Sequence, residues 1–239
     1  LVQGSEALDH SRLTNLSGLD SADFEQLRHF WPRIPTDRRR DMMSRLVALV
    51  EDDVNLNFDD IFRYSLQDED PTVRERGIAG LWECEDRTLI SDLVSLIEGD
   101  PVEEVRISAA IGLGRFSNLA ILGALLSKDR EQVQEVLIAL VEDGGEGTEL
   151  RRRALEAVAV VNTAKISFLI QDAYHSAEVE MRLSSIYAMG RTCDVKWLPT
   201  LLNELSSDDP AMRYESANAC GALGEDEATP YLVPLLEDD

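Results

Sequence analysis

Apolar residues recur along this chain at helical spacing, in segments that come in pairs. One stripe follows the i, i+3, i+4, i+7 spacing of a single helical face: Leu198, Leu201, Leu202 and Leu205. Stripes of the same kind lie at 89–97 and 133–141. A segment richer in Ala, Gly and Ser precedes each stripe, and small side chains allow close helix packing. The pattern predicts an all-α chain built from helix pairs.

An arginine near the start of each small-residue helix, the first helix of a pair, gives the period. The helix opens at a capping acid, often followed by Pro in the first turn, as at Asp70-Pro71 and Asp209-Pro210. The aligned arginines are Arg39, Arg74, Arg106, Arg151, Arg182 and Arg213, at intervals of 35, 32, 45, 31 and 31 residues. Such a period is typical of a repeat array. It predicts about six pairs over residues 34–239, with an insertion at 117–129 between the helices of one pair.

The segment before the array has a different pattern. Asp20 precedes a stretch with Phe24, Leu27 and Phe30 on one side, and Pro32 ends it. This predicts a helix that caps the first repeat, and residues 1–17 are polar and expected to be loose. The predicted organisation is therefore a loose N-terminus and capping helix at 1–33, followed by a repeat array at 34–239.

The repeat motifs resemble those of HEAT repeats, and most of all the short bacterial repeats also found in bilin-lyase-like proteins. The matching segments are 209–224 with Pro230, and 180–190 with Pro199. The resemblance covers residues 37–239. It implies a right-handed α-solenoid of about six antiparallel helix pairs that serves as a protein-binding scaffold rather than an enzyme. It also implies that the second helix of each pair lines the concave face.

Two other functions stay open at this point. A bilin-lyase-like or chaperone-like accessory protein that acts on a partner protein follows from the same resemblance alone. A DNA-glycosylase branch of helical repeats would need a basic groove. The chain instead carries 23 basic and 46 acidic residues, a formal net charge of −23. Such a chain repels polyanions, which argues against nucleic acid and anionic membranes as partners and favours a protein or peptide, with a basic one attracted most.

No motif for catalysis or metal binding stands out. The histidines are scattered and have no second ligand three or four residues away: His10, His29 and His175. Nucleophile, metalloprotease and phosphate-loop motifs are absent from the sequence. We therefore expect no catalytic residues, no metal and no cofactor.

The cysteines bear on the compartment. There are three, without close spacing: Cys84, Cys193 and Cys220. This is no disulfide framework, and we expect each to be a small apolar residue inside a helix. No apolar run is long enough to span a membrane. These features together favour a cytoplasmic location.

The repeated arginine is the most regular charged feature. Arg74, Arg106, Arg151, Arg182 and Arg213 occupy the same position in successive repeats. A row of arginines could bind an anion, but recurrence in every repeat favours a structural role. We expect each to bond acidic caps or helix ends of neighbouring repeats and so to set their stacking.

Two aromatic residues are candidate binding anchors. Trp197 and Tyr231 stand where the aligned second helices have Ala228 and Thr200, so both rings are predicted to be exposed. With Lys196, Thr200 and Asn203 they form the predicted partner-binding site: Lys196, Trp197, Thr200, Asn203 and Tyr231. The alternative is that the rings pack into the core between repeats. Trp82 stands where Gly114 and Gly190 do, and is expected to fill a gap at the turn.

Overall fold

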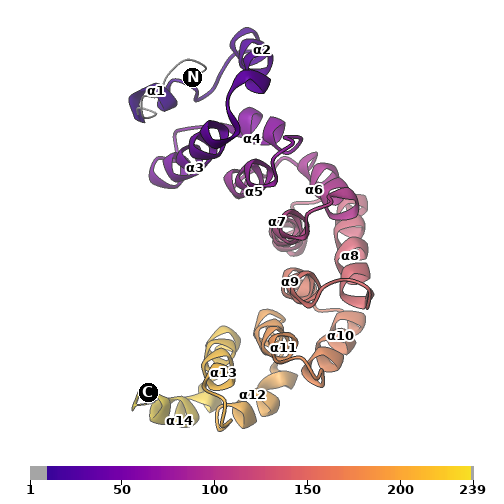
Figure 1. The fold of residues 1–239 in the computed structure, drawn as a ribbon. Coiled ribbons are helices and arrows are strands. Elements are labelled where there is room, and N and C mark those ends of the chain that lie inside the picture. Colours follow the sequence, from indigo (N-terminus) through magenta and orange to yellow (C-terminus); the bar gives the residue numbers. More distant parts are fainter. Residues whose placement is uncertain (1–9, 238–239) are drawn as a thin grey trace. The chain divides into compact units, whose positions relative to one another are not determined.

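The computed structural model describes residues 10–237, which form helices and connecting turns with no strand (Figure 1). The contacts divide the chain into two compact units, one up to Gly112 and the other from Leu113 onward. Helix α7 (Glu103–Ile121) contributes to both. The all-α architecture predicted from the hydrophobic pattern is confirmed.

Unit 1 holds the N-terminal helices. They are α1 (His10–Thr14), α2 (Ser21–Phe30), α3 (Thr36–Asp52), α4 (Asp59–Ser65), α5 (Pro71–Gly80), α6 (Leu89–Gly99) and the start of α7. The first helices α3 and α5 pack against each other, and α5 also packs against its predecessor α4. Phe58 and Phe62 are fully buried between these helices and meet edge to face.

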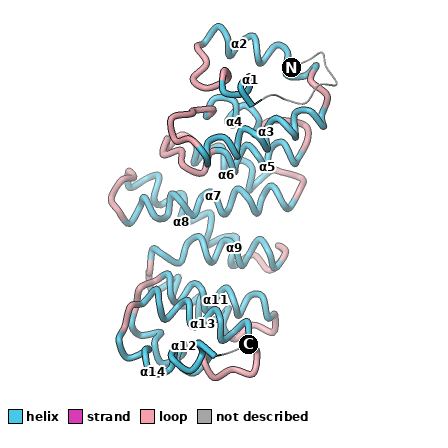
Figure 2. The backbone as a smooth tube through the Cα atoms, turned by 90° about the vertical axis from the view of Figure 1, so that its left-hand side faces the viewer, coloured by secondary structure: helices cyan, strands magenta, loops and turns pink. Residues whose placement is uncertain are grey.

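Unit 2 repeats the same packing. Its helices are the rest of α7, α8 (Ser127–Glu142), α9 (Thr148–Val158), α10 (Ala164–Tyr174), α11 (Val179–Arg191), α12 (Leu198–Glu204), α13 (Pro210–Leu223) and α14 (Thr229–Leu232). Helix α11 packs against the first helices on both sides, α9 and α13, and against α10. Figure 2 shows α9, α11 and α13 as successive members of one layer.

Small residues set the spacing within this layer. A Cβ added to Gly190 of α11 would lie 2.7 Å from the Cα of Ala219 on α13, and one added to Gly114 would lie 3.2 Å from the Cα of Ala157. The first helices of unit 2 therefore approach backbone to backbone, which makes their layer the inner side of this unit (Figure 1). The expectation that second helices line the concave face is wrong for this unit, because the close approach occurs on the other layer.

Acidic caps begin several helices as the sequence predicts. The Asp20 side chain accepts bonds from the amides of Ala22 and Asp23 at 2.9 Å and starts α2. Asp70 accepts from the amide of Val73 at 3.1 Å at the start of α5. These bonds satisfy amides that lack an intrahelical partner, so each element boundary is encoded locally.

Two expectations are corrected. Residues 10–14 form α1, and Leu13 is buried, because α1 packs against α3; residues 1–9 of the segment expected to be loose lie outside the described residues. The extra residues at 117–129 are not a separate inserted segment. They lengthen α7 to Ile121 and start α8 at Ser127, so that a turn of 122–126 joins two long helices. The boundary at residues 33 and 34 stays a prediction.

Candidate partner-binding face

The exposed side of the first-helix layer is the candidate face, called here the first-helix face. Each unit has its own such face, made by α3, α5 and the start of α7 in unit 1 and by the rest of α7, α9, α11 and α13 in unit 2. In unit 1 this face contains a cleft of about 670 Å³, within the range of sites that bind small molecules or side chains. The apolar part of its lining includes Val47, Val54, Ile78, Trp82 and Ile111.

Trp82 occupies a special position in the repeat. Counted from the repeated arginine, it is equivalent to Gly114 and Gly190, which in unit 2 lie against an alanine of the next first helix. The residue of α7 equivalent to that alanine is Gly112, and Gly112 and Trp82 both line the cleft. At the equivalent position in unit 2, a glycine hydrogen lies against the methyl group of an alanine, and an indole is too large for that space. Trp82 therefore remains 54% exposed, and the expectation that it fills a gap at the turn is wrong.

Acidic side chains surround the cleft. Its lining includes Glu51, Asp59, Glu75 and Glu83, whereas none of the described lining residues is Lys or Arg. Burial raises the pKa of Glu75, and the neighbouring carboxylate of Glu104 adds to the shift. Both causes disfavour negative charge at Glu75. A cation placed in the cleft would offset the repulsion from Glu104, adding to the effect of Arg76 and Arg74, which lower this pKa.

The first-helix face of unit 2 has a different character. The Arg152 guanidinium donates to Glu149 at 2.7 Å and to Glu156 at 3.3 Å, and the Ser184 hydroxyl donates to Glu156. Burial, and after it the charge of Glu156, raises the pKa of Glu215 on α13. Arg152 is thus paired with carboxylates of its own helix, and Ser184 joins this group to α11, so these side chains hold α9 and α11 together.

Exposed tyrosines lie on the same face of unit 2. Tyr187 of α11 is 40% exposed and Tyr214 of α13 is 70% exposed. Tyrosine combines apolar area with a polar hydroxyl and is enriched in protein interfaces. Neither tyrosine stands out in the sequence. Their common distinction, a bulky ring at an outward position of a first helix, becomes apparent only once that layer is known to carry the face.

The repeated arginines bond the turn or helix end that precedes their own helix. Arg182 donates to the carbonyls of Ser176 and Ala177 at 3.0 and 3.2 Å, and Arg213 makes the same pair of bonds to residues 207 and 208. Arg106 and Arg151 reach the carbonyls of Ile97 and Val141, the last turns of α6 and α8. The geometry fits the predicted stacking role, whose contribution to stability stays a prediction.

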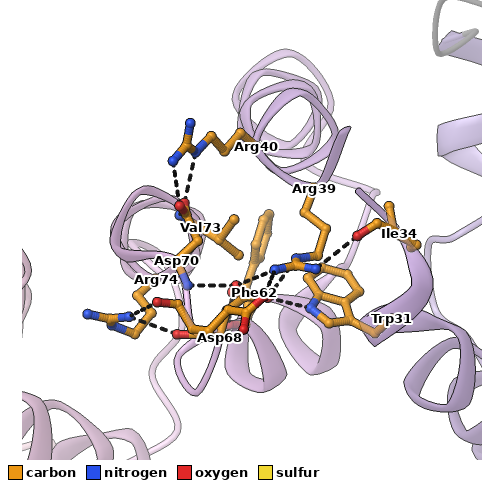
Figure 3. Close-up of polar contacts among 11 residues, drawn as sticks. Trp31, Ile34, Arg39, Arg40, Phe62, Asp68, Asp70, Val73 and Arg74 are labelled. Atoms are coloured by element: carbon orange, nitrogen blue, oxygen red, sulfur yellow. Dashed lines mark hydrogen bonds and ion pairs between the residues drawn. The ribbon is translucent and has the colours of Figure 1, made fainter. Parts of the chain in front are cut away.

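The repeated arginines are most buried in unit 1. Arg74 makes two 2.7 Å bonds to the Asp100 carboxylate and a 2.8 Å bond to the carbonyl of Asp68. The Asp68 side chain in turn binds Arg39 and accepts a 2.6 Å bond from the indole N–H of Trp31 (Figure 3). These bonds connect the pair α3/α4 to the pair α5/α6 through buried charges.

The predicted site around Trp197 is only partly exposed. Trp197 is 5% exposed, so the expectation of an exposed anchor is wrong there and the alternative of a core ring holds. Its sister residue Ala228 is also buried. The position therefore points inward in both repeats, and the size of the residue changes only how much of the core it fills.

The other members of that site lie on the second-helix layer. Lys196 is exposed, lies 5.1 Å from the centre of the Trp197 ring, and bonds the Ser167 hydroxyl at 2.7 Å. Asn203 is exposed and Thr200 is half-buried on α12, while Tyr231 on α14 is 52% exposed. The structure thus leaves Lys196, Asn203 and Tyr231 available to solvent, and partner binding by this site stays a prediction.

Few side chains are grouped for chemistry. No cluster of three or more His, Cys, Asp or Glu suited to a metal ion occurs among the described residues. Cys84 and Cys193 lie in turns, and Cys193 is exposed at a positive φ of 51°, so the expectation that all cysteines sit inside helices is wrong. Cys220 is buried within α13 as expected. Across the part of the chain that is described, helices long and apolar enough to cross a bilayer are lacking.

The comparison with protein families settles the fold family. A model described as HEAT repeats matches residues 60–159 and 166–239, well over half of the chain. The chain belongs to the HEAT-repeat family. The resemblance seen in the Asp-Pro openings and the repeated arginines is thereby confirmed. A search of curated proteins finds no match.

Several solved structures are similar to this chain. An engineered protein is 17% identical, with 91% of this HEAT chain and 97% of that chain covered and a TM-score of 0.52. Human deoxyhypusine hydroxylase is 18% identical over 96% of this chain and 82% of that one, with a TM-score of 0.37. A chain from the structure of Kap95p with RanGDP is 10% identical over 95% of this chain and 27% of that one, with a TM-score of 0.47. Of these three, the match to the engineered protein has a TM-score above 0.5 and shows a shared fold alone, and none of them says anything about activity.

Proposed function

We propose that this HEAT-repeat chain is a scaffold that binds a protein partner through the first-helix face of one or both of its units, without transforming it chemically. The observation that carries the proposal is the cleft of unit 1, where an exposed tryptophan lies among apolar walls on the layer of first helices. Tyr187 and Tyr214 supply exposed aromatic area on the same layer of unit 2. Exposed aromatic residues beside apolar area are the usual anchors of protein interfaces.

The charge supports a choice of partner. A formal net charge of −23 attracts basic surfaces, raises the rate of their encounter and disfavours nucleic acid and anionic lipid. The bilin-lyase-like or chaperone-like alternative would use the same face, with the partner modified or folded rather than held. No residue cluster in the described chain favours that alternative over simple binding.

Site-specific photo-crosslinking tests the proposal. A photoreactive residue replaces Ala79 or Asn218 on first helices, or Ser95 or Asn203 on second helices, and all four positions are exposed. Ala79 and Asn218 are compared with Ser95 as face against back. Asn203 tests the alternative site on the second helices. We expect the same partner protein to be crosslinked from Ala79 and Asn218 and not from Ser95. Crosslinks from the second-helix positions alone would refute the proposal, and a crosslink confined to Asn203 would support the site of Lys196 and Tyr231 instead.

A further inference from the structure

We infer that the cleft of unit 1 binds a basic amphipathic helix of the partner protein, with Trp82 stacking on a lysine or arginine side chain. The inference rests on the proposed function and adds the chemistry of the ligand and the residue that anchors it. It follows from three properties of the cleft, namely its shape, its apolar surface and the sign of its charge.

The shape and surface fit a helix that presents anchors at one face. The cleft is bounded by α3 with the turn after it, by α5, and by α7. Val54 is 84% exposed, Trp82 54% and Ile111 38%, so large apolar groups line it without being covered. An amphipathic helix laid in a groove covers such groups with side chains spaced three and four residues apart.

The charge selects a cation. Four carboxylates belong to the lining and none of its described residues is basic, while burial and Glu104 raise the pKa of Glu75. A lysine or arginine of the ligand would lower the cost of ionising Glu75, and its charge would be attracted to the face of the Trp82 ring. A second copy of this chain is a poor occupant, because two chains of formal charge −23 repel each other.

The tryptophans provide a direct readout. Of the three tryptophans, Trp31 and Trp197 are 4% and 5% exposed, whereas Trp82 is 54% exposed. Quenching by acrylamide in the free protein therefore reports mainly on Trp82. The probe is a synthetic helical peptide of about 14 residues with leucine on one face and lysine on the other, the anchor spacing of groove-binding helices. We expect it to shift the emission of Trp82 to shorter wavelength and to protect it from acrylamide.

Two control peptides separate this inference from general attraction between opposite charges. One has glutamate in place of each lysine, and we expect no protection of Trp82 from it. The other keeps the composition but scrambles the order, which removes the apolar face, and we expect at least about tenfold weaker binding. Equal binding by the scrambled peptide would overturn the inference, because charge alone would then explain the affinity.

Variants locate the site. Trp82→Ala should weaken binding of the lysine peptide by about thirtyfold, as expected for an interface hot spot, whereas Phe168→Ala, which removes a 64% exposed ring from the second helix α10, should leave it unchanged. Glu51→Gln with Glu75→Gln should slow association and reduce its dependence on salt, whereas Glu131→Gln on α8 should do neither. Unchanged helical circular dichroism is required of each variant.

The outcomes distinguish this inference from the proposed function. If the partner found by crosslinking binds Trp82→Ala as well as it binds the unmodified chain, the inference falls and the scaffold proposal stands. If no partner is crosslinked from the first-helix face, while the lysine peptide still protects Trp82, the cleft chemistry stands and the scaffold proposal falls.

Discussion

The buried pair of Arg39 and Asp68 makes a quantitative prediction about stability. Their side chains are 4% and 2% exposed, and the two groups approach to 3.0 Å. The Asp68 carboxylate also accepts from the Trp31 indole at 2.6 Å and from the Asp70 amide at 2.9 Å. In Asp68→Asn, an amide NH₂ group replaces one acceptor oxygen and faces donors, and the buried guanidinium loses its counter-charge.

The expected loss is large. Removing one partner of a buried ion pair costs about 3–5 kcal/mol. Arg39 keeps a 2.9 Å bond to the carbonyl of Ile34 and a 3.0 Å contact with Glu69, so we expect the lower end, about 3 kcal/mol. That is a substantial part of the roughly 5–15 kcal/mol by which a protein of this kind is stable.

Urea unfolding followed by circular dichroism measures the change, and hydrogen exchange of the amides of α3, α4 and α5 locates it in unit 1. Glu25→Gln is the matched control, because Glu25 pairs with Arg28 at the surface, with side chains 66% and 47% exposed, and should cost less than about 0.5 kcal/mol. Adding Arg39→Met to Asp68→Asn should recover part of the loss, because no guanidinium then stays buried without its partner, while the asparagine oxygen can still accept from Trp31 or Asp70. A loss below about 1 kcal/mol in Asp68→Asn would refute the reasoning.

Three further predictions concern unit 2. Arg182→Ala should lower stability by about 1–2 kcal/mol, since two charge-assisted bonds to carbonyls are lost at a half-buried site; an unchanged melting temperature would contradict this. Gly190→Ala should destabilise the chain by about 1–3 kcal/mol, because its Cβ would lie 2.7 Å from a neighbouring Cα, whereas Gly221→Ala, with nothing within 4 Å, should be neutral or stabilising in thermal melts. Burial and the adjacent Glu204 carboxylate raise the pKa of Tyr174 to about 12. The folded chain therefore favours the neutral phenol of Tyr174. The resulting contribution to stability is complete below about pH 10, the pKa of an unperturbed tyrosine, and is lost as the pH rises through 12. An ultraviolet titration should show one late tyrosine, which moves earlier in Glu204→Gln; a titration without a late step would be inconsistent with this contact.

The helix pairs could be predicted because their signals are local. An apolar stripe, a capping aspartate and a repeated arginine each act within one helix or the adjoining turn, so Asp70 and Arg182 can be recognised without a three-dimensional structure. The extended α7 and α8 were missed for a related reason. The interval between Arg106 and Arg151 shows that residues are added, but not whether they lengthen helices or form a loop.

The candidate site could not be predicted in the same way, because exposure depends on how closely neighbouring helices approach. Trp197 and Trp82 are both large residues at positions that are small in sister repeats, but this pattern leaves both an exposed ring and a core ring open at Trp197 and wrongly places Trp82 in a gap at the turn. At Trp197 the sister alanine is itself buried, so the position belongs to the core. At Trp82 the sister glycines touch the next helix, so a large ring must turn outward.

One hydrogen bond in unit 2 joins residues that lie much farther apart in the sequence than those joined by the neighbouring hydrogen bonds. The Arg191 guanidinium, at the end of α11, donates to the Asn118 side chain of α7 at 2.7 Å, a separation of 73 residues that passes over α9. In a repeat array where each pair mainly contacts the next, a chain pulled from its ends would be expected to yield one pair at a time. This bond closes a loop around α9, so that under mechanical load α7, α9 and α11 should give way in a single step.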